Sequence, residues 1–187
     1  EKDIHEALQA VAASLPPQLV AADPWPKLVA AWATIGKEGL KLSVGENFST
    51  HTALIGELAR FQRVIADQNS LTNDPDIDSS YLIDTLIEEL PRALESMGQL
   101  RAIGTGALSR KEPLAMAQQV ELASALGTLN SAVDGLRRNL AKTAHYNPGL
   151  QSVLDAAGKD MGAAAEKFGA MVNDDILSER YEMLPAV

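Results

Sequence analysis

The chain has 187 residues and a formal net charge of −9, with 25 Asp and Glu against 16 Lys and Arg. One domain of ordinary size accounts for this length. The acidic balance argues against nucleic acid as a partner, because phosphates are bound through clustered Lys and Arg. Cysteine is absent, which excludes a disulfide framework, a thiolate metal site and a cysteine nucleophile. Aromatic residues make up only 4% of the chain, so we predict an aliphatic core and an all-α fold.

The first half of the chain predicts one short helix and one long helix. Residues 1–15 form an amphipathic pattern that Pro16-Pro17 should end. A long helix is predicted over 24–69, either straight or bent near Gly36 and Gly39. Its second half carries a seven-residue repeat typical of a bundle seam, made of Val44, His51, Leu58 and Ile65.

Three further long helices are predicted over 75–109, 113–146 and 148–178. Each long helix follows an acidic or amide residue and a proline, a common helix start signal. Pro91 lies inside the second of the four long segments, where a kink is expected rather than a break, because the apolar stripe continues past it. Short turns between rods of this length favour antiparallel neighbours. The prediction is a single domain, an up-down-up-down four-helix bundle with a short extra N-terminal helix.

Catalytic and metal-binding patterns find little support in the sequence, so we predict no enzyme activity, no cofactor and no metal site. The three histidines, His5, His51 and His145, lack the i, i+4 spacing of a helical metal site. The alternation of Asp74, Asp76 and Asp78 is similar to the start of a calcium loop. However, Ser79 replaces the turn glycine and Thr85 replaces the bidentate glutamate. Capping of the next helix is the simpler interpretation.

The polar joint 67–81 and the helices that flank it are the predicted place for a ligand. Candidate contacts are His51, Arg60, Asp78, Tyr81 and Arg101. Structural alternatives stay open for each of them. His51 could be a core histidine bonded to a neighbouring helix, Arg60 part of a solvated face, Tyr81 a cover for the bundle end, and Arg101 a partner of a carboxylate such as that of Glu57. Asn139 is expected to fix helix register with a buried hydrogen bond.

An ordered string of short motifs resembles the periplasmic helical-bundle sensor domains of methyl-accepting chemotaxis receptors and related sensor histidine kinases. The string covers about residues 25–110, and one departure from it is Ser80, where an aromatic residue is expected beside Tyr81. The motifs are Phe48-x-x-His51-Thr52-x-Leu54-Ile55, Val64-x-x-Asp67-x-x-Ser70-Leu71-x-x-Asp74-Pro75-x-x-Asp78-Ser79-x-Tyr81-Leu82, Leu90-Pro91 and Gly98-x-x-Arg101-x-x-Gly104.

The resemblance implies an extracytoplasmic ligand-sensing domain of a bacterial transmembrane receptor, on the periplasmic side of the inner membrane. Such a domain would bind a small anionic molecule, signal by helix displacement and act as a homodimer in the intact receptor. No stretch of this chain is apolar enough to cross a bilayer, so membrane contact is expected only through flanking segments. The alternative is a helical scaffold or granule-surface interaction protein with no ligand.

Overall fold

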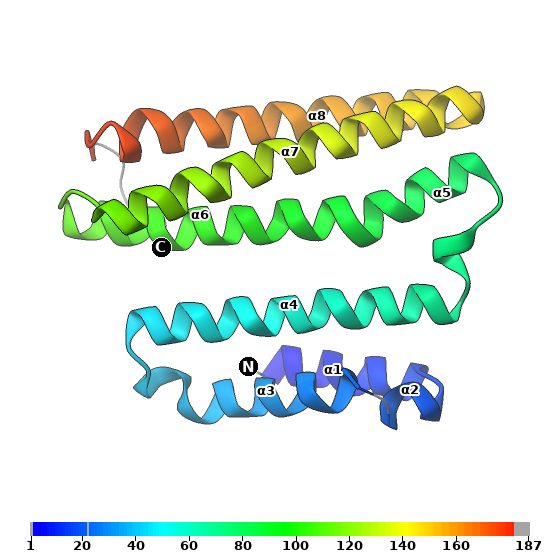
Figure 1. Cartoon of the computed structure of the whole chain (residues 1–187), viewed down its shortest axis with the longest axis horizontal. Coiled ribbons are helices and arrows are strands. Elements are labelled where there is room, and N and C mark those ends of the chain that lie inside the picture. The colour runs from blue at the N-terminus through cyan, green and yellow to red at the C-terminus, as the bar shows by residue number, and fades with distance from the viewer. Residues whose placement is uncertain (1, 22, 182–187) are drawn as a thin grey trace. The chain divides into compact units, whose positions relative to one another are not determined.

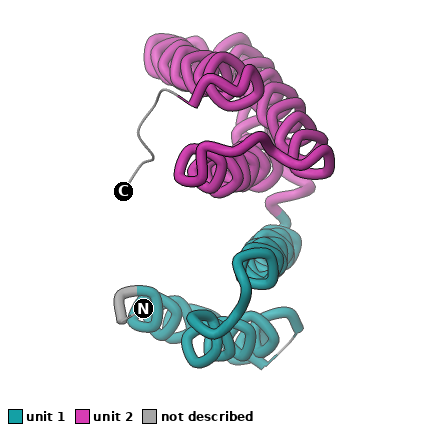
Figure 2. The backbone as a smooth tube through the Cα atoms, turned by 90° about the vertical axis from the view of Figure 1, so that its left-hand side faces the viewer, with its two compact units in different colours: residues 1–70 teal, residues 71–187 magenta. Residues whose placement is uncertain are grey.

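The structure is a computed structural model that describes residues 2–21 and 23–181. Within these residues every regular element is a helix (Figure 1), which confirms the all-α prediction. The chain divides into two compact units, residues 1–70 and residues 71–187 (Figure 2). The boundary between the units falls in the polar joint that the sequence had marked as the ligand region.

Unit 1 contains α1 (Lys2–Ser14), α2 (Pro17–Ala21), α3 (Trp25–Glu38) and α4 (Val44–Gln68). Its core is small and centres on buried Trp25, Leu28 and Phe61, with the ring centroids of Trp25 and Phe61 4.9 Å apart. Partly buried side chains from α1 and α4 complete it, including Leu8 and Leu54. The prolines end α1 as predicted, although Pro17 also begins α2.

The prediction of one helix over 24–69 is wrong, because α3 and α4 are separate helices that lie side by side (Figure 1). Between them the 3-10 turn η1 (Gly39–Lys41) and an extended Ser43 reverse the chain. Ser43 and Glu46 form a capping box, in which each side chain accepts a hydrogen bond from the other's backbone N–H. A box of this kind stabilises a new helix start. The Asn47 amide donates to the Gly39 carbonyl at 2.8 Å and fixes the turn.

Unit 2 begins with η2 (Leu71–Asn73) and a continuous rod formed by α5 (Ile77–Asp84), the π turn η3 (Thr85–Glu89) and α6 (Leu90–Arg110). Within η3 the Leu90 N–H donates to the Thr85 carbonyl, five residues back. Pro91 follows directly and has no N–H to donate. The wider π turn places the irregularity just before the proline, so the rod continues past it as predicted.

The remaining rods of unit 2 are α7 (Met116–Tyr146) and α8 (Gln151–Met171), joined by η4 (Pro148–Leu150). A second π turn, η5 (Val172–Leu177), continues α8. The rod of α5 and α6 runs antiparallel to α7, and α7 runs antiparallel to α8 (Figure 1). Leucine and alanine dominate the core between them, which includes Leu100, Ala107, Leu122, Leu129, Ala132, Leu136, Ala165, Val172 and Ile176.

Two of the four start signals are displaced relative to the prediction. Helix α5 starts at Ile77 and α7 at Met116, two and three residues after Pro75 and Pro113. Before α7, Ala115 is extended and its N–H donates to the Gln118 side chain at 3.4 Å. The proline therefore precedes a short extended segment, and the helix begins only after it.

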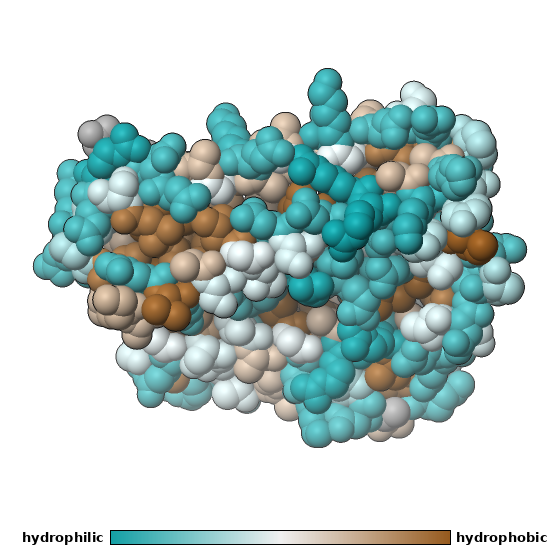
Figure 3. All heavy atoms as spheres, turned by 45° about the horizontal axis from the view of Figure 1, so that its top comes forward, coloured by the Kyte–Doolittle hydropathy of each residue, from teal (hydrophilic) through white to brown (hydrophobic). Residues whose placement is uncertain are grey.

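Unit 2 also leaves large aliphatic side chains uncovered, among them those of Met116, Val120 and Val153. A view of one face of the molecule shows apolar patches between hydrophilic residues (Figure 3). Isolated apolar residues on a surface are normal for folded proteins. Within the described residues, none of the helices combines the length and the apolar character needed to cross a membrane.

Candidate functional site

Asp78 joins the start of α5 to the end of α7. Its carboxylate accepts a hydrogen bond from the Asn147 side-chain amide at 2.9 Å. Its backbone carbonyl accepts one from the hydroxyl of Thr143 at 3.2 Å, and Thr143 is fully buried. Two bonds from one residue therefore fix the distance between the two helices at this end of unit 2.

The Asn147 amide is the main reason that the pKa of Asp78 lies below its ordinary value. The backbone N–H of Ser79 adds to the effect, whereas partial burial opposes it by raising the pKa. Asp78 is consequently ionised at neutral pH, and its charge is used in the contact with α7.

A second contact between the same helices lies about two turns further along. The amide of Asn139 donates to the Asp84 carboxylate at 2.6 Å, and Asn139 is 9% exposed. The expectation that Asn139 forms a buried hydrogen bond between helices is confirmed. Because a polar group in an apolar seam must meet its partner, this pair fixes the register of α5 on α7.

Tyr81 meets a cation that the sequence reasoning missed. The ammonium of Lys142 donates to the Tyr81 hydroxyl at 2.9 Å and lies 4.6 Å from the centroid of the Tyr81 ring. Lys142 is exposed, so its remaining N–H groups can reach a solute. The aromatic ring and its hydroxyl hold one positive charge in a defined place at the helix surface.

Arg138 and His145 lie one turn before and one turn after Lys142 on α7, at the i, i+4 and i+7 positions of one helix side. All three side chains are exposed. We call these residues the basic face of α7. The neighbouring α5 carries Asp78 and Asp84, so the basic face borders an acidic helix in a chain whose net charge is −9.

His51 and Arg60 belong to α4 in unit 1. His51 is half-buried, and its Nδ1 lies 2.9 Å from the Asn47 carbonyl one turn back in the same helix. A carbonyl only accepts, so Nδ1 is the donor in this contact. Arg60 is exposed and pairs with Glu57 of its own helix at 2.5 Å.

Arg101 lies on α6 in unit 2 with its side chain exposed. Of the five predicted contacts, the structure thus brings Asp78 and Tyr81 together, one turn apart on α5 and both against α7. It adds Lys142, Thr143 and Asn147 to them. For Thr143 and Asn147 the only sequence signal was their four-residue spacing from Asn139. This spacing continues the edge of the apolar stripe on which Asn139 lies.

Asp74 of the polar joint forms hydrogen bonds at the start of α5. The Asp74 carboxylate accepts hydrogen bonds from the backbone N–H of Asp76 at 2.9 Å and from the Ser79 hydroxyl at 2.7 Å. The predicted helix capping is not made by the N-cap residue, Asp76, whose side chain forms no capping hydrogen bond. Asp74 instead stabilises the turn that precedes α5. Within the described residues there is no group of three or more His, Cys, Asp or Glu arranged to hold a metal ion.

Comparison of the chain with protein-family models, with curated proteins and with solved structures finds no match.

Proposed function

We propose that this chain is the extracytoplasmic ligand-sensing domain of a bacterial transmembrane signalling receptor, such as a chemoreceptor or a sensor histidine kinase. The observation that carries the proposal is the Lys142 ammonium, held over Tyr81 and flanked by Arg138 and His145. Three basic side chains on one helix side suit a small anion. They do so on a molecule that is otherwise strongly acidic, which supports a local rather than a general affinity for negative charge.

The ligand would be a small carboxylate. One of its oxygens would accept from Lys142, and the Tyr81 hydroxyl, which already accepts from Lys142, would donate to the same group. An exposed ion pair alone contributes little, so an aromatic or aliphatic ligand body packed beside the Tyr81 ring has to add to the affinity. His51, Arg60 and Arg101 remain proposed ligand contacts.

The proposal includes a four-helix bundle of long antiparallel rods. In support, α4 carries exposed Ile55 and Leu58, at 42% and 49%, on the side that continues the repeat of His51. In unit 2, Leu94 of α6 is 60% exposed. Apolar side chains on two amphipathic helices are what a closed bundle would cover.

Signalling would use the contacts between α5 and α7. Asp78 and Asp84 hold the two helices in one register, and a ligand that bridges Tyr81 and the basic face would favour that register over any other. Binding shifts an equilibrium only by its difference in affinity between the two packings. The last helix, α8, packs on α7 and would move by about 1–2 Å, a scale common in helix switching.

A thermal-shift screen tests the binding step. Small carboxylates, aromatic acids and amino acids are added to the purified chain, and a ligand at about 100 times its Kd should raise the melting temperature by roughly 5 °C or more. The Lys142→Gln substitution should abolish the rise. Lys159→Gln, which removes an exposed cation from α8, should preserve it.

Two results would contradict the proposal. One is a complete panel without any shift, and the other is a shift that Lys142→Gln leaves unchanged. A chain without a ligand would instead fit a helical scaffold or granule-surface protein. The location is tested separately in the full gene, where a receptor requires apolar segments of about 20 residues on both sides of this domain. The homodimer is tested by the mass of the intact receptor in detergent.

A further inference from the structure

The first half of α7 has an exposed side that is free of charge. Between Glu112 and Asp134 the sequence contains a single charged residue, Glu121, whereas 22% of the whole chain is charged. The exposed residues of this side are small or apolar: Met116, Ala117, Val120, Ala123, Ser124, Gly127, Asn130 and Ser131. We call them the neutral face of α7. The neutral face lies before the basic face on the same helix.

Two large side chains of the neutral face are uncovered. Met116 is 74% exposed and Val120 is 61% exposed, and the two residues lie one turn apart. An adjacent pair of this kind marks a contact site more strongly than a single exposed apolar residue does. Further along, Ala123 is exposed and a Cβ at Gly127 would meet nothing within 4 Å. A second helix can approach closely there, because the distance between helix axes depends on the side chains between them.

The neutral face has the spacing of a coiled-coil seam. Five of its residues follow one another at intervals of four and three residues, namely Met116, Val120, Ala123, Gly127 and Asn130. These intervals are those of the a and d positions of a heptad repeat. The core of unit 2 uses a different set of α7 positions, which includes Leu122 and Leu129. Helix α7 therefore has one stripe that packs in its own unit and a second stripe that this unit leaves open.

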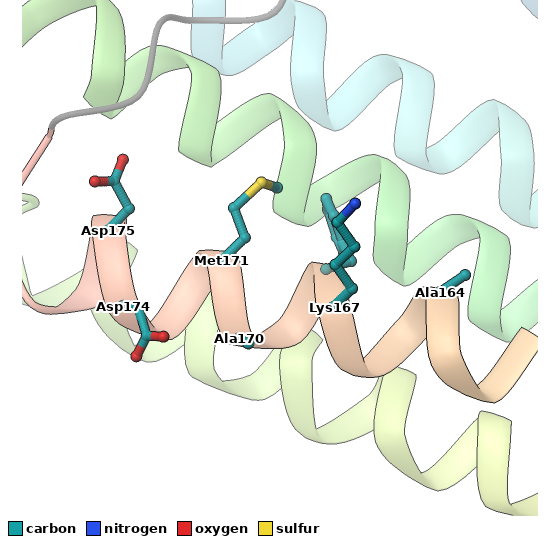
Figure 4. Close-up of a pocket in the computed structure, with 7 residues that line it drawn as sticks. Ala164, Lys167, Ala170, Met171, Asp174 and Asp175 are labelled. Atoms are coloured by element: carbon teal, nitrogen blue, oxygen red, sulfur yellow. The ribbon is translucent and has the colours of Figure 1, made fainter.

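A groove on α8 and η5, about 600 Å³ in volume, is another apolar surface of unit 2. Phe168 of this groove packs against the core of the unit. In Figure 4, Lys167 extends from the same side of α8 as Met171. If two copies met through this groove about a two-fold axis, Lys167 would lie near its own counterpart. Like charges at a contact oppose binding, so the neutral face suits a contact between copies better.

We propose that the neutral face of α7 binds the same face of a second copy of this chain, with the two helices parallel. The parallel direction rests on the proposed function, because two receptor copies in one membrane point the same way and a two-fold axis along the membrane normal keeps equivalent helices parallel. Each residue of the seam then lies opposite its own counterpart. An uncharged surface does this without repulsion, whereas a surface for a different protein can carry charges that the partner matches.

The charges beyond the neutral face limit the length of the contact. Asp134 continues the seam spacing four residues after Asn130, and its side chain is 64% exposed. Opposite its counterpart, Asp134 would push the two helices apart. The basic face would repel its own copy in the same way, so Lys142 stays open to a ligand. The contact thus covers residues 116–131, about 22 Å of helix.

The size of this contact predicts a weak dimer for the isolated chain. One pair of helices over this length buries less than the roughly 1,000 Å² of a stable interface. Anchoring two copies in one membrane raises their effective concentration, so the same contact should be populated more fully in the intact receptor. A method that captures transient contacts is therefore needed for the isolated chain.

Single-cysteine cross-linking tests the contact in the full chain, which has no cysteine of its own. A disulfide requires two Cα atoms within about 7 Å of each other. With an oxidant present, Met116→Cys and Ala123→Cys should each form linked dimers at least about tenfold faster than Ala141→Cys. Ala141 is the matched control, because it is exposed on the same helix but lies next to Lys142 of the basic face.

The pattern of linking also tests the direction of the helices. In an antiparallel pair that crosses near Ala123, the two copies of residue 116 would be about 20 Å apart. Linking by Ala123→Cys without linking by Met116→Cys would therefore overturn the parallel contact. Equal rates at all three positions would indicate random collisions and would overturn it as well. So would a lack of linking at Met116 and Ala123 up to the highest soluble concentration.

A pair of valine substitutions tests the chemistry of the face. In the Ala123→Cys background, Val120→Glu places two carboxylates opposite each other and should slow linking by about tenfold or more. Val153→Glu is the control, since Val153 is 69% exposed on α8, and it should change the rate by less than about twofold. Both positions are exposed, so the circular dichroism spectra should stay helical. Equal slowing by the two substitutions would contradict the neutral face as the contact.

Ligand binding and cross-linking separate this inference from the sensor proposal. Linking at Met116 and Ala123 in a chain that binds none of the screened acids would support the contact between copies and would count against the sensor. Ligand binding that Lys142→Gln abolishes, in a chain that forms no links at these positions, would support the sensor and overturn the proposed contact.

Discussion

At the scale of single residues, Asp78 shows how a charge can hold two helices without being buried deeply. The Asn147 amide and the Ser79 N–H stabilise its ionised form, and Thr143 adds a bond to its carbonyl. The same residue therefore serves the start of α5 and the end of α7. Its neighbour Tyr81 places Lys142, so the structural contact and the proposed ligand contact lie one helical turn apart.

The Asp78 carboxyl group should make stability depend on pH in one direction. Its folded pKa is lowered, so its contribution to the free energy of unfolding is complete above the ordinary pKa of about 3.9 and is lost as the pH falls through the lower folded value. We expect Asp78→Asn to lower the urea midpoint at pH 7 and the difference from wild type to shrink below about pH 4. Urea unfolding from pH 7 to pH 3 measures it.

Asp155→Asn is the control for this series, because Asp155 is exposed on α8. It should follow the wild type within about 0.5 kcal/mol at every pH. A difference between Asp78→Asn and wild type that stays constant down to pH 3 would mean that the charge of Asp78 does not matter, and that only the change in hydrogen-bonding groups does.

The sequence predicted the residues of this contact unevenly, for a physical reason. Asn139 stood out because a lone amide at the edge of a leucine stripe must find a partner. Lys142 did not stand out, since a lysine at a polar helix position is ordinary. Which side chain it meets depends on the rotation of α7 against α5, and the periodicity of one helix carries no information about the rotation of another.

At the scale of elements, the helical segments were predictable because leucine and alanine repeat at helical spacing, most clearly in α7. The break between α3 and α4 was missed although its signal is present in the sequence. Ser43-x-x-Glu46 matches the capping-box pattern, but the apolar repeat from Val44 onward favoured one continuous helix over 24–69. The π turns were not predictable from periodicity, because they depend on local features of the chain such as Pro91, which directly follows η3.

Gly104 sets how closely α6 approaches η5. The Gly104→Ala substitution should lower the free energy of unfolding by about 1–2 kcal/mol, because overpacking against Ile176 outweighs the usual gain from alanine in a helix. In an Ile176→Val background, which lacks Cδ1, the same substitution should be neutral or stabilising. Thermal or urea unfolding of the four proteins in this cycle measures the coupling.

Gly127→Ala provides the matched control, since a Cβ at Gly127 of α7 would meet nothing within 4 Å. That variant should gain about 0.5–1 kcal/mol. If Gly104→Ala were as stabilising as Gly127→Ala, the close approach of Ile176 to α6 would be disproved.

At the scale of the whole molecule, the two units have separate cores. The core of unit 2 is drawn from residues between 90 and 181, whereas that of unit 1 uses residues between 8 and 65. The sequence indicated one domain because the length fits one and because the heptad repeat of α4 is similar to the stripes of α6 and α7. Periodicity shows that a helix has an apolar side but not which helix covers it.

Fragments test how the units contribute to stability. Residues 71–187 should keep a helical circular dichroism spectrum and a single cooperative thermal transition, because their core is internal. Residues 1–70, whose core has few large buried side chains, should melt broadly and at a lower temperature. The proposed four-helix bundle adds a further condition, since a fourth rod that covers exposed apolar side chains would make the full chain melt above the 71–187 fragment. Equal melting temperatures for the full chain and the fragment would contradict a closed four-helix bundle, and an unfolded 71–187 fragment would contradict the independence of its core.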